Sequence, residues 1–356
     1  MRLKLLILPA MIFVSAACSG GAVASQPTTQ PATVTSVPAT SAVTPTVAPT
    51  ANATAPATLA PATPTAIPTR APTPTVTPIF VPPASFIRKW GTTGKETGQF
   101  NFPRGVAVDP QGNVYVADTF NERVQKFTST GEFILTWRTT GRVWGIATDI
   151  NSNVYITIPD HHMIQKYSSD GNLLTSIGQQ GAAPGQFDNP FGVATDSQGN
   201  IYVADTDNWR VQKFTPDGKF VMQLKGTSDH QINQPRGVAV DNAGNIFAID
   251  GTNTLIQKFD AQGNFVMQWG GVGGGNGQFD FPTGVAVDEK GNVYVADYNN
   301  QRIQEFTNSG QFVGKVGSFG NQDGQLRFTR GIAVFQGLLY AADGNNDRIQ
   351  VFAAPQ

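Results

Sequence analysis

An acidic, an amide and a basic side chain recur at fixed spacing in the C-terminal part of the chain. The four complete sets are Asp118, Asn121 and Arg123; Asp205, Asn208 and Arg210; Asp297, Asn300 and Arg302; and Asp343, Asn346 and Arg348. A carboxylate and a guanidinium this close in sequence predict a local ion pair with further hydrogen bonds to loop carbonyls. Because catalysis needs one site and this set recurs, we assign it a structural role.

The three histidines are the candidates for a metal site. His161 and His162 are adjacent, so their side chains are expected to diverge, and His230 belongs to a distant repeat. Zinc needs several converging ligands, and the single cysteine excludes a cysteine-based centre. Gly-x-Ser-x-Gly, P-loop and HExxH motifs do not occur. We predict no metal, no cofactor and no catalytic residue.

These side chains are carried by a repeat of 40 to 47 residues. The segment Gly105 to Asp109 recurs from Gly145, Gly192, Gly237, Gly284 and Gly331. Each copy begins a series of short runs rich in Val, Ile, Tyr and Phe, separated by turn residues, which is typical of hairpin strands. Four strands per repeat and six repeats predict an all-β fold, a six-bladed propeller with four-stranded antiparallel blades.

The ends of the array predict how the ring closes. The last repeat ends after its third strand, residues 348–352, while an additional strand at 86–90 precedes the first repeat. This additional strand matches the fourth strand of the fourth repeat, residues 265–270. We expect strand 86–90 to pair with strand 348–352 and complete the sixth blade, which removes exposed sheet edges.

The repeated segments P-x-G-V-A-V-D, G-N-V-Y-V-A-D and N-x-R-V-Q-K-F resemble NHL repeats over nearly all of residues 84–356. The resemblance implies a propeller that binds proteins or RNA, acts as a sensor or, in some members, as a lyase. Some relatives attach a RING domain, but this chain has no Cys/His framework for one.

The residue before each innermost-strand glycine is expected to surround the mouth of the central channel, on the face with the variable loops. These residues are Arg104, Trp144, Phe191, Arg236, Thr283 and Arg330. Variable loops on a rigid scaffold are the usual place for binding. Three guanidiniums and two aromatic rings could bind an anion, a glycan or an acidic peptide. The alternative is that the arginines only pack on loop carbonyls.

The second repeat departs from the others. Its leading connection, Trp137 to Gly145, is about seven residues shorter, which predicts a notch between the first two blades. We expect Phe120, Trp144, His161 and His162 to line this notch. The alternative is a degenerate blade without a site.

The N-terminal segments predict export and anchoring. Residues 1–17 combine Arg2 and Lys4 with a short apolar run, as in a signal peptide. Ser15-Ala16-Ala17-Cys18 resembles a bacterial lipobox, which implies cleavage before Cys18 and a lipid on its thiol. Residues 18–83 are expected to be a disordered linker, since residues 22–83 hold 14 Pro, 16 Thr and one charge. Residues 84–356 form the propeller.

The charge balance argues against nucleic acid. Of the 24 basic residues, three precede residue 84, so the propeller has 21 basic and 25 acidic residues and a net charge of −4. We interpret the protein as a monomeric, membrane-anchored recognition module outside the cytoplasm, which binds a protein, peptide or envelope polymer. The alternative is a metal-dependent lyase or lactone hydrolase with its site in the channel.

Overall fold

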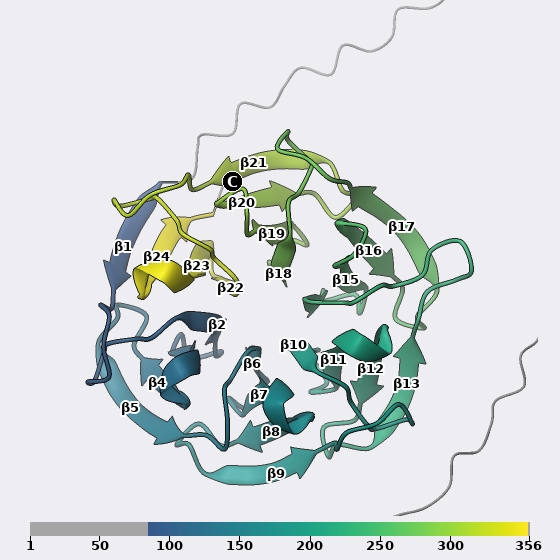
Figure 1. The fold of residues 1–356 in the computed structure, drawn as a ribbon, viewed down its shortest axis with the longest axis horizontal. Helices are drawn as coiled ribbons and strands as arrows, with labels where there is room; N and C mark the ends of the chain where they lie inside the picture. Colours follow the sequence, from purple (N-terminus) through teal and green to yellow (C-terminus); the bar gives the residue numbers. More distant parts are fainter. Residues whose placement is uncertain (1–84, 355–356) are drawn as a thin grey trace, which may run out of the picture. The chain divides into compact units, whose positions relative to one another are not determined.

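The computed structural model describes residues 85–354. The predicted signal peptide, Cys18 and the Thr/Pro-rich linker lie outside these residues. Within them, six four-stranded antiparallel sheets surround a central axis as the blades of a propeller (Figure 1). This confirms the predicted fold class. None of the helices in the described part has the length and apolar character to cross a membrane.

Each blade runs from an innermost strand at the channel to an outermost strand at the rim. Blade 1 contains β2 (Pro103–Val108), β3 (Val114–Asp118), β4 (Arg123–Phe127) and β5 (Phe133–Arg138). Blade 2 contains β6 (Ile146–Thr148), β7 (Val154–Ile158), β8 (Met163–Tyr167) and β9 (Leu173–Ile177). Blade 3 contains β10 (Pro190–Thr195), β11 (Ile201–Asp205), β12 (Arg210–Phe214) and β13 (Phe220–Leu224).

The second half of the ring repeats this order. Blade 4 contains β14 (Val238–Val240), β15 (Ile246–Asp250), β16 (Leu255–Phe259) and β17 (Phe265–Gly270). Blade 5 contains β18 (Pro282–Val287), β19 (Val293–Asp297), β20 (Arg302–Phe306) and β21 (Phe312–Val316). Blade 6 contains β22 (Ile332–Phe335), β23 (Leu338–Asp343), β24 (Arg348–Ala353) and β1 (Phe86–Trp90).

The N-terminal strand closes the ring, as predicted. β1 pairs antiparallel with β24, with Phe86 opposite Phe352 and Trp90 opposite Ile349. The Trp90 ring also lies 5.9 Å from the Phe127 ring of blade 1. Residues from both ends of the array therefore complete blade 6, and Trp90 ties that blade to its neighbour.

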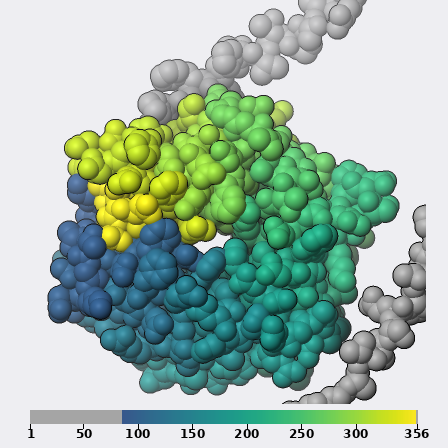
Figure 2. Space-filling model, viewed as in Figure 1, coloured from purple at the N-terminus to yellow at the C-terminus, as the bar shows by residue number. Residues whose placement is uncertain are grey.

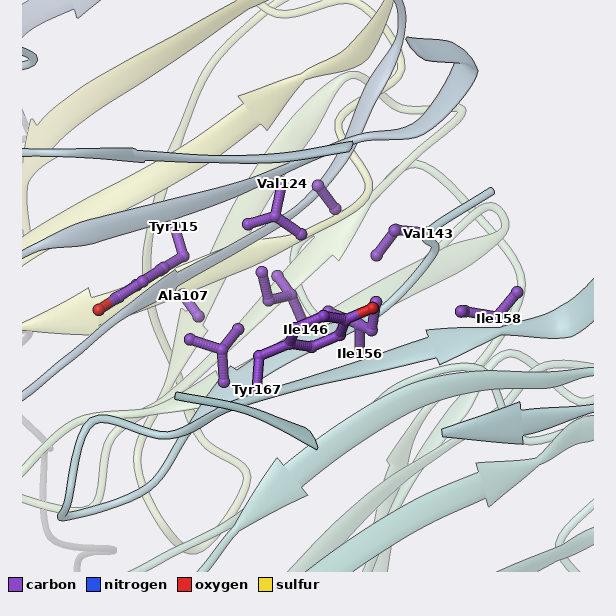
Figure 3. Packing of buried hydrophobic residues seen from close by; sticks show 10 residues of the cluster. Ala107, Tyr115, Val124, Val143, Ile146, Ile156, Ile158 and Tyr167 are labelled. Atoms are coloured by element: carbon purple, nitrogen blue, oxygen red, sulfur yellow. The ribbon is translucent and has the colours of Figure 1, made fainter. Parts of the chain in front are cut away.

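The hydrophobic core lies between neighbouring blades. Every residue of β3 and β7 is buried, because each sheet is covered on both faces by the adjacent blades. Figure 3 shows the packing between blades 1 and 2, where Tyr115 and Val124 face the same cluster as Ile156 and Tyr167. This explains why the second strand of a repeat is apolar at consecutive positions instead of alternating.

A ring of glycines narrows the channel below its mouth. A Cβ added at Gly284 would lie 2.2 Å from the Arg330 carbonyl oxygen of the next blade, and one at Gly145 would lie 2.3 Å from that of Phe191. Real Cβ atoms do not approach backbone so closely, so glycine lets the innermost strands come together. The same contacts place the mouth residues against the preceding blade.

We expect Gly284→Ala to destabilise the propeller by about 1–3 kcal/mol, because the added methyl group must push the Arg330 backbone away. Gly274→Ala is the matched control, since its nearest neighbour would be an Asn300 side-chain oxygen at 3.7 Å. Urea unfolding of both variants measures the difference. Equal stability of the two variants would contradict the close approach.

Candidate binding site at the channel mouth

The mouth of the channel opens on the face with the variable loops. Pro103 lies opposite Asp118, where β3 ends and the 3₁₀ turn Thr119–Asn121 begins. Figure 2 shows the opening at the centre of the blades. All six residues predicted for the mouth line one cavity of about 110 Å³ there, namely Arg104, Trp144, Phe191, Arg236, Thr283 and Arg330.

Aromatic rings hold the three guanidinium planes. The Arg104 guanidinium lies 3.8 Å from the centre of the Trp144 ring. That of Arg236 lies 3.5 Å from the Phe281 ring, and that of Arg330 lies 4.4 Å from the Tyr298 ring. A guanidinium stacked on an aromatic face keeps its N–H edges available for bidentate contact with an oxyanion.

Several of these N–H groups have no partner. Within residues 85–354, Nε and Nη1 of Arg104, Nη1 of Arg236 and Nε of Arg330 are buried and make no hydrogen bond. Each unsatisfied buried donor costs free energy, more so on a charged group. Buried polar groups are satisfied in most proteins, so three arginines with such groups around one cavity are unusual.

Burial and mutual repulsion act on the same three cations. Burial, followed by repulsion from Arg330 and Arg142, lowers the pKa of Arg104 to about 9. Burial, followed by repulsion from Arg330, lowers the pKa of Arg236 to about 10. Burial also lowers the pKa of Arg330. An anion between them would relieve both effects.

The other mouth residues have different roles. Trp144 packs on Phe191 with 4.2 Å between ring centres, which makes an aromatic wall on blades 2 and 3. Thr283 donates its hydroxyl to the Arg330 carbonyl oxygen at 3.2 Å, so it links blades 5 and 6 instead of facing a ligand.

Three aromatic partners of the arginines, Phe102, Phe281 and Tyr298, were not among the predicted site residues. Phe102 and Phe281 have left-handed backbones, with φ of 54° and 58°, and Tyr298 follows the end of β19. An aromatic residue two positions before a mouth arginine, as in Phe102-Pro103-Arg104, is a sequence signal that predicts such a partner. Stacking across a blade boundary, as between Arg236 and Phe281, has no such signal.

The predicted notch residues have different neighbours in the structure. The ring centres of Phe120 and Trp144 lie 5.5 and 3.8 Å from the guanidinium carbon of Arg104. His162 turns toward blade 3, where its Nδ1 accepts a hydrogen bond from the Asn189 backbone N–H at 3.1 Å. His161 lies beside Gly141 of the shortened connection.

The recurring Asp, Asn and Arg residues form networks within the blades. In blade 3, Arg210 Nε donates to the Asp205 carboxylate at 2.7 Å, while its Nη atoms donate to the carbonyls of Ala182, Ala183 and Gln186. The other three sets have the same ion pair, at 2.6 or 2.7 Å, in Asp118 and Arg123, Asp297 and Arg302, and Asp343 and Arg348. In these four blades the network ties the preceding connection to the blade.

The groups that line the mouth favour anion binding over metal coordination. The side chains there are guanidinium, aromatic, hydroxyl and aliphatic groups, none of which is a usual ligand for zinc. No cluster of three or more His, Cys, Asp or Glu side chains is placed to hold a metal ion anywhere in residues 85–354.

The fold and repeat sequence define the class as a six-bladed propeller that contains NHL repeats. The family described as NHL repeat matches residues 100–127, 187–214 and 279–306. The predicted resemblance is thereby confirmed for blades 1, 3 and 5, and for the other three blades it stays a prediction.

Two curated proteins share short stretches of this sequence. B-box type zinc finger protein ncl-1 of Caenorhabditis elegans is 51% identical over 45 residues, which are 13% of this chain and 5% of that protein. Protein brain tumor of Drosophila melanogaster is 43% identical over 60 residues, 15% of this chain and 6% of that protein. The chain therefore covers a small fraction of the length of these relatives.

Solved structures share the architecture. A streptogramin B lyase superposes with a TM-score of 0.56 at 14% identity, covering 74% of this chain and 97% of the lyase. The gluconolactonase XC5397 of Xanthomonas campestris has a TM-score of 0.56 at 16% identity, and the match covers 79% of this chain and 99% of that protein. A protein of unknown function from Bacteroides thetaiotaomicron has a TM-score of 0.60 at 18% identity, and the match covers 76% of this chain and 75% of that protein. At these identities the likeness shows the fold alone.

Proposed function

We propose that the propeller is a recognition module that binds an anionic group of a protein, peptide or envelope polymer at the channel mouth. The observation that carries the proposal is the set of buried, unpartnered N–H groups on Arg104, Arg236 and Arg330. A planar guanidinium fork matches a carboxylate or phosphate bidentately. The Trp144 and Phe191 wall adds apolar contact for the group that bears the charge.

The same chain contains arginines that serve structure, and they differ from those at the mouth. Arg302 donates through Nε to Asp297 and through both Nη atoms to the carbonyls of Gly274, Gly275 and Gln278. Its charge is compensated and its donors are used. Within residues 85–354, each of the three mouth arginines keeps at least one buried N–H group without a hydrogen-bond partner, which favours binding over packing on loop carbonyls.

This difference predicts opposite effects of one substitution on stability. Arg330→Met removes a buried cation that repels Arg104 and Arg236 and is expected to stabilise the ligand-free propeller by about 1 kcal/mol, as is common when a binding residue is removed. Arg302→Met is the control and is expected to destabilise. Thermal unfolding measures both. If Arg330→Met also lowers the melting temperature, the arginine serves the fold and the binding proposal fails.

We further propose that the propeller is displayed outside the cytoplasm as a monomer, anchored by a lipid on Cys18 and separated from the membrane by the Thr/Pro-rich linker. The lipobox-like Ser15-Ala16-Ala17-Cys18 supports this. Labelling of cells with radioactive palmitate, comparing the native chain with Cys18→Ala, tests the anchor.

A further inference from the structure

A second hollow lies away from the mouth, between blades 3 and 4. It has a volume of about 500 Å³. One wall is the turn after β11, with Asp207, Asn208 and Trp209, and the other is the connection after β13, with Lys225, Thr227 and Ser228.

The hollow exists because this connection folds unlike the others. Four connections use a parallel bridge of the kind between Thr93 and Phe100, whereas the connection into blade 4 uses an antiparallel bridge between Gly226 and Gln231. It also places Ile232 where blade 1 has Phe100, and both side chains are buried. The connection projects from the edge of the propeller (Figure 1).

Trp209 forms an exposed aromatic surface in this hollow. Its side chain is 52% exposed, whereas the other four tryptophans of the chain are partly buried. Its backbone is left-handed, with φ of 55°, a conformation that is unfavourable for a bulky residue. The corresponding turn positions of other blades hold smaller or polar residues, for example Glu122, Thr254 and Gln301. An exposed tryptophan in a strained turn is a feature expected of a binding surface.

The groups around Trp209 are polar and nearly balanced in charge. Asp207 uses one carboxylate oxygen to accept from Asn189 at 3.1 Å, which leaves its second carboxylate oxygen as an acceptor. Asn208 donates its Nδ2 to the Gly181 carbonyl, which leaves its amide oxygen as an acceptor. Thr227 and Ser228 offer hydroxyls that donate and accept, and Lys225 offers donors. Asp207 and Lys225 bring opposite charges, unlike the three cations of the mouth.

We propose that this hollow binds a neutral saccharide, with the C–H face of one pyranose ring stacked on Trp209 and its hydroxyls bound by Asp207, Asn208 and the Thr227–Ser228 loop. A sugar ring has an apolar face and a rim of groups that both donate and accept. An aromatic surface flanked by acceptors, donors and hydroxyls matches both parts. The inference is independent of anion binding at the mouth.

Affinity electrophoresis of the full chain in detergent tests the proposal. Native gels would contain laminarin, dextran, galactomannan or glycol chitin, and the wild type is expected to be retarded in at least one of them. Trp209→Ala should weaken that retardation at least tenfold, and Trp209→Tyr should retain part of it. Phe319→Ala is the matched control, because Phe319 is an aromatic residue 65% exposed on another inter-blade connection.

The same gels show whether the hollow beside Trp209 binds independently of the channel mouth. Arg330→Met is expected to be retarded like the wild type, since the mouth does not contribute to the hollow. Retardation of the wild type in none of the four gels, or equal retardation of Trp209→Ala and wild type, would overturn the saccharide site and leave the mouth proposal unaffected.

Discussion

Replacement of Asp205 by Ile or of Arg210 by Met is expected to destabilise the propeller by about 3–5 kcal/mol, because each change leaves the other charge buried without its partner. The exposed fractions of the two side chains are 0% and 2%. Asp205 also accepts hydrogen bonds from the Asp188 backbone N–H and from the Asn208 and Gln212 amides. Loss of the carboxylate therefore frees three donors in addition to the guanidinium.

The double variant separates the ion pair from the rest of the network. Asp205→Ile with Arg210→Met reproduces the pair that blade 2 has naturally, Ile158 and Met163. Its cost should be smaller than the sum of the two single changes by about 2 kcal/mol or more, since no unpaired charge remains. Urea unfolding of the four proteins gives the coupling energy. Simple additivity would show that the two side chains act separately.

The second large effect concerns Glu305, which replaces a lysine found at the same position in four other blades. Those lysines are Lys126, Lys166, Lys213 and Lys258, and each amine lies 5.0 to 5.5 Å from the centre of an aromatic ring on the second strand. In blade 5 the Glu305 carboxylate takes this place and accepts from the Tyr294 hydroxyl at 2.9 Å. Its Oε2 is buried and has no partner in the described residues.

Burial, with a smaller contribution from the negative charge of Asp288, raises the pKa of Glu305 from the ordinary 4.5 to about 7. The folded protein therefore holds this proton more tightly than the unfolded chain does. The stability that comes from the neutral acid is present below pH 4.5 and is lost as the pH rises through about 7. At 1.36 kcal/mol per pKa unit, the loss above pH 7 is about 3 kcal/mol.

Glu305→Gln is expected to be more stable than the wild type at pH 8 and to lose most of that advantage at pH 5, a change of about 2–3 kcal/mol in the difference between them. Glu305→Lys should also stabilise at pH 8, because it restores the cation over Tyr294 and beside Asp288. Free energies of unfolding in urea at the two pH values provide the measurement. A difference that is independent of pH would mean that Glu305 is ionised throughout.

The repeat pattern was sufficient to predict the propeller, its closure by strand 86–90 and the residues around the mouth. These follow from features that recur in the sequence: the strand runs, the turns and the glycine of each innermost strand. The glycine has a physical cause, since the next blade leaves no room for a Cβ at Gly284.

Other features depend on contacts between blades and could not be predicted from one repeat. The stacking of Arg236 on Phe281 joins residues from different blades, and the hollow beside Trp209 depends on the irregular connection into blade 4. The neighbours of the notch residues are also of this kind: the Phe120 ring packs on the Phe102 ring at 5.6 Å, and His162 Nδ1 lies 3.2 Å from the Asp188 carboxylate. Local sequence does not specify such side-chain choices.

Isothermal titration with hexaglutamate tests most directly whether the mouth binds an anion. The wild type is compared with the triple variant Arg104→Met, Arg236→Met and Arg330→Met in 50 mM and in 300 mM sodium chloride, with hexalysine as the control peptide. The predicted result is saturable binding of hexaglutamate to the wild type, weaker at the higher salt concentration, and no binding to the triple variant. Equal affinity of both proteins, or no binding to the wild type, would contradict the proposed site.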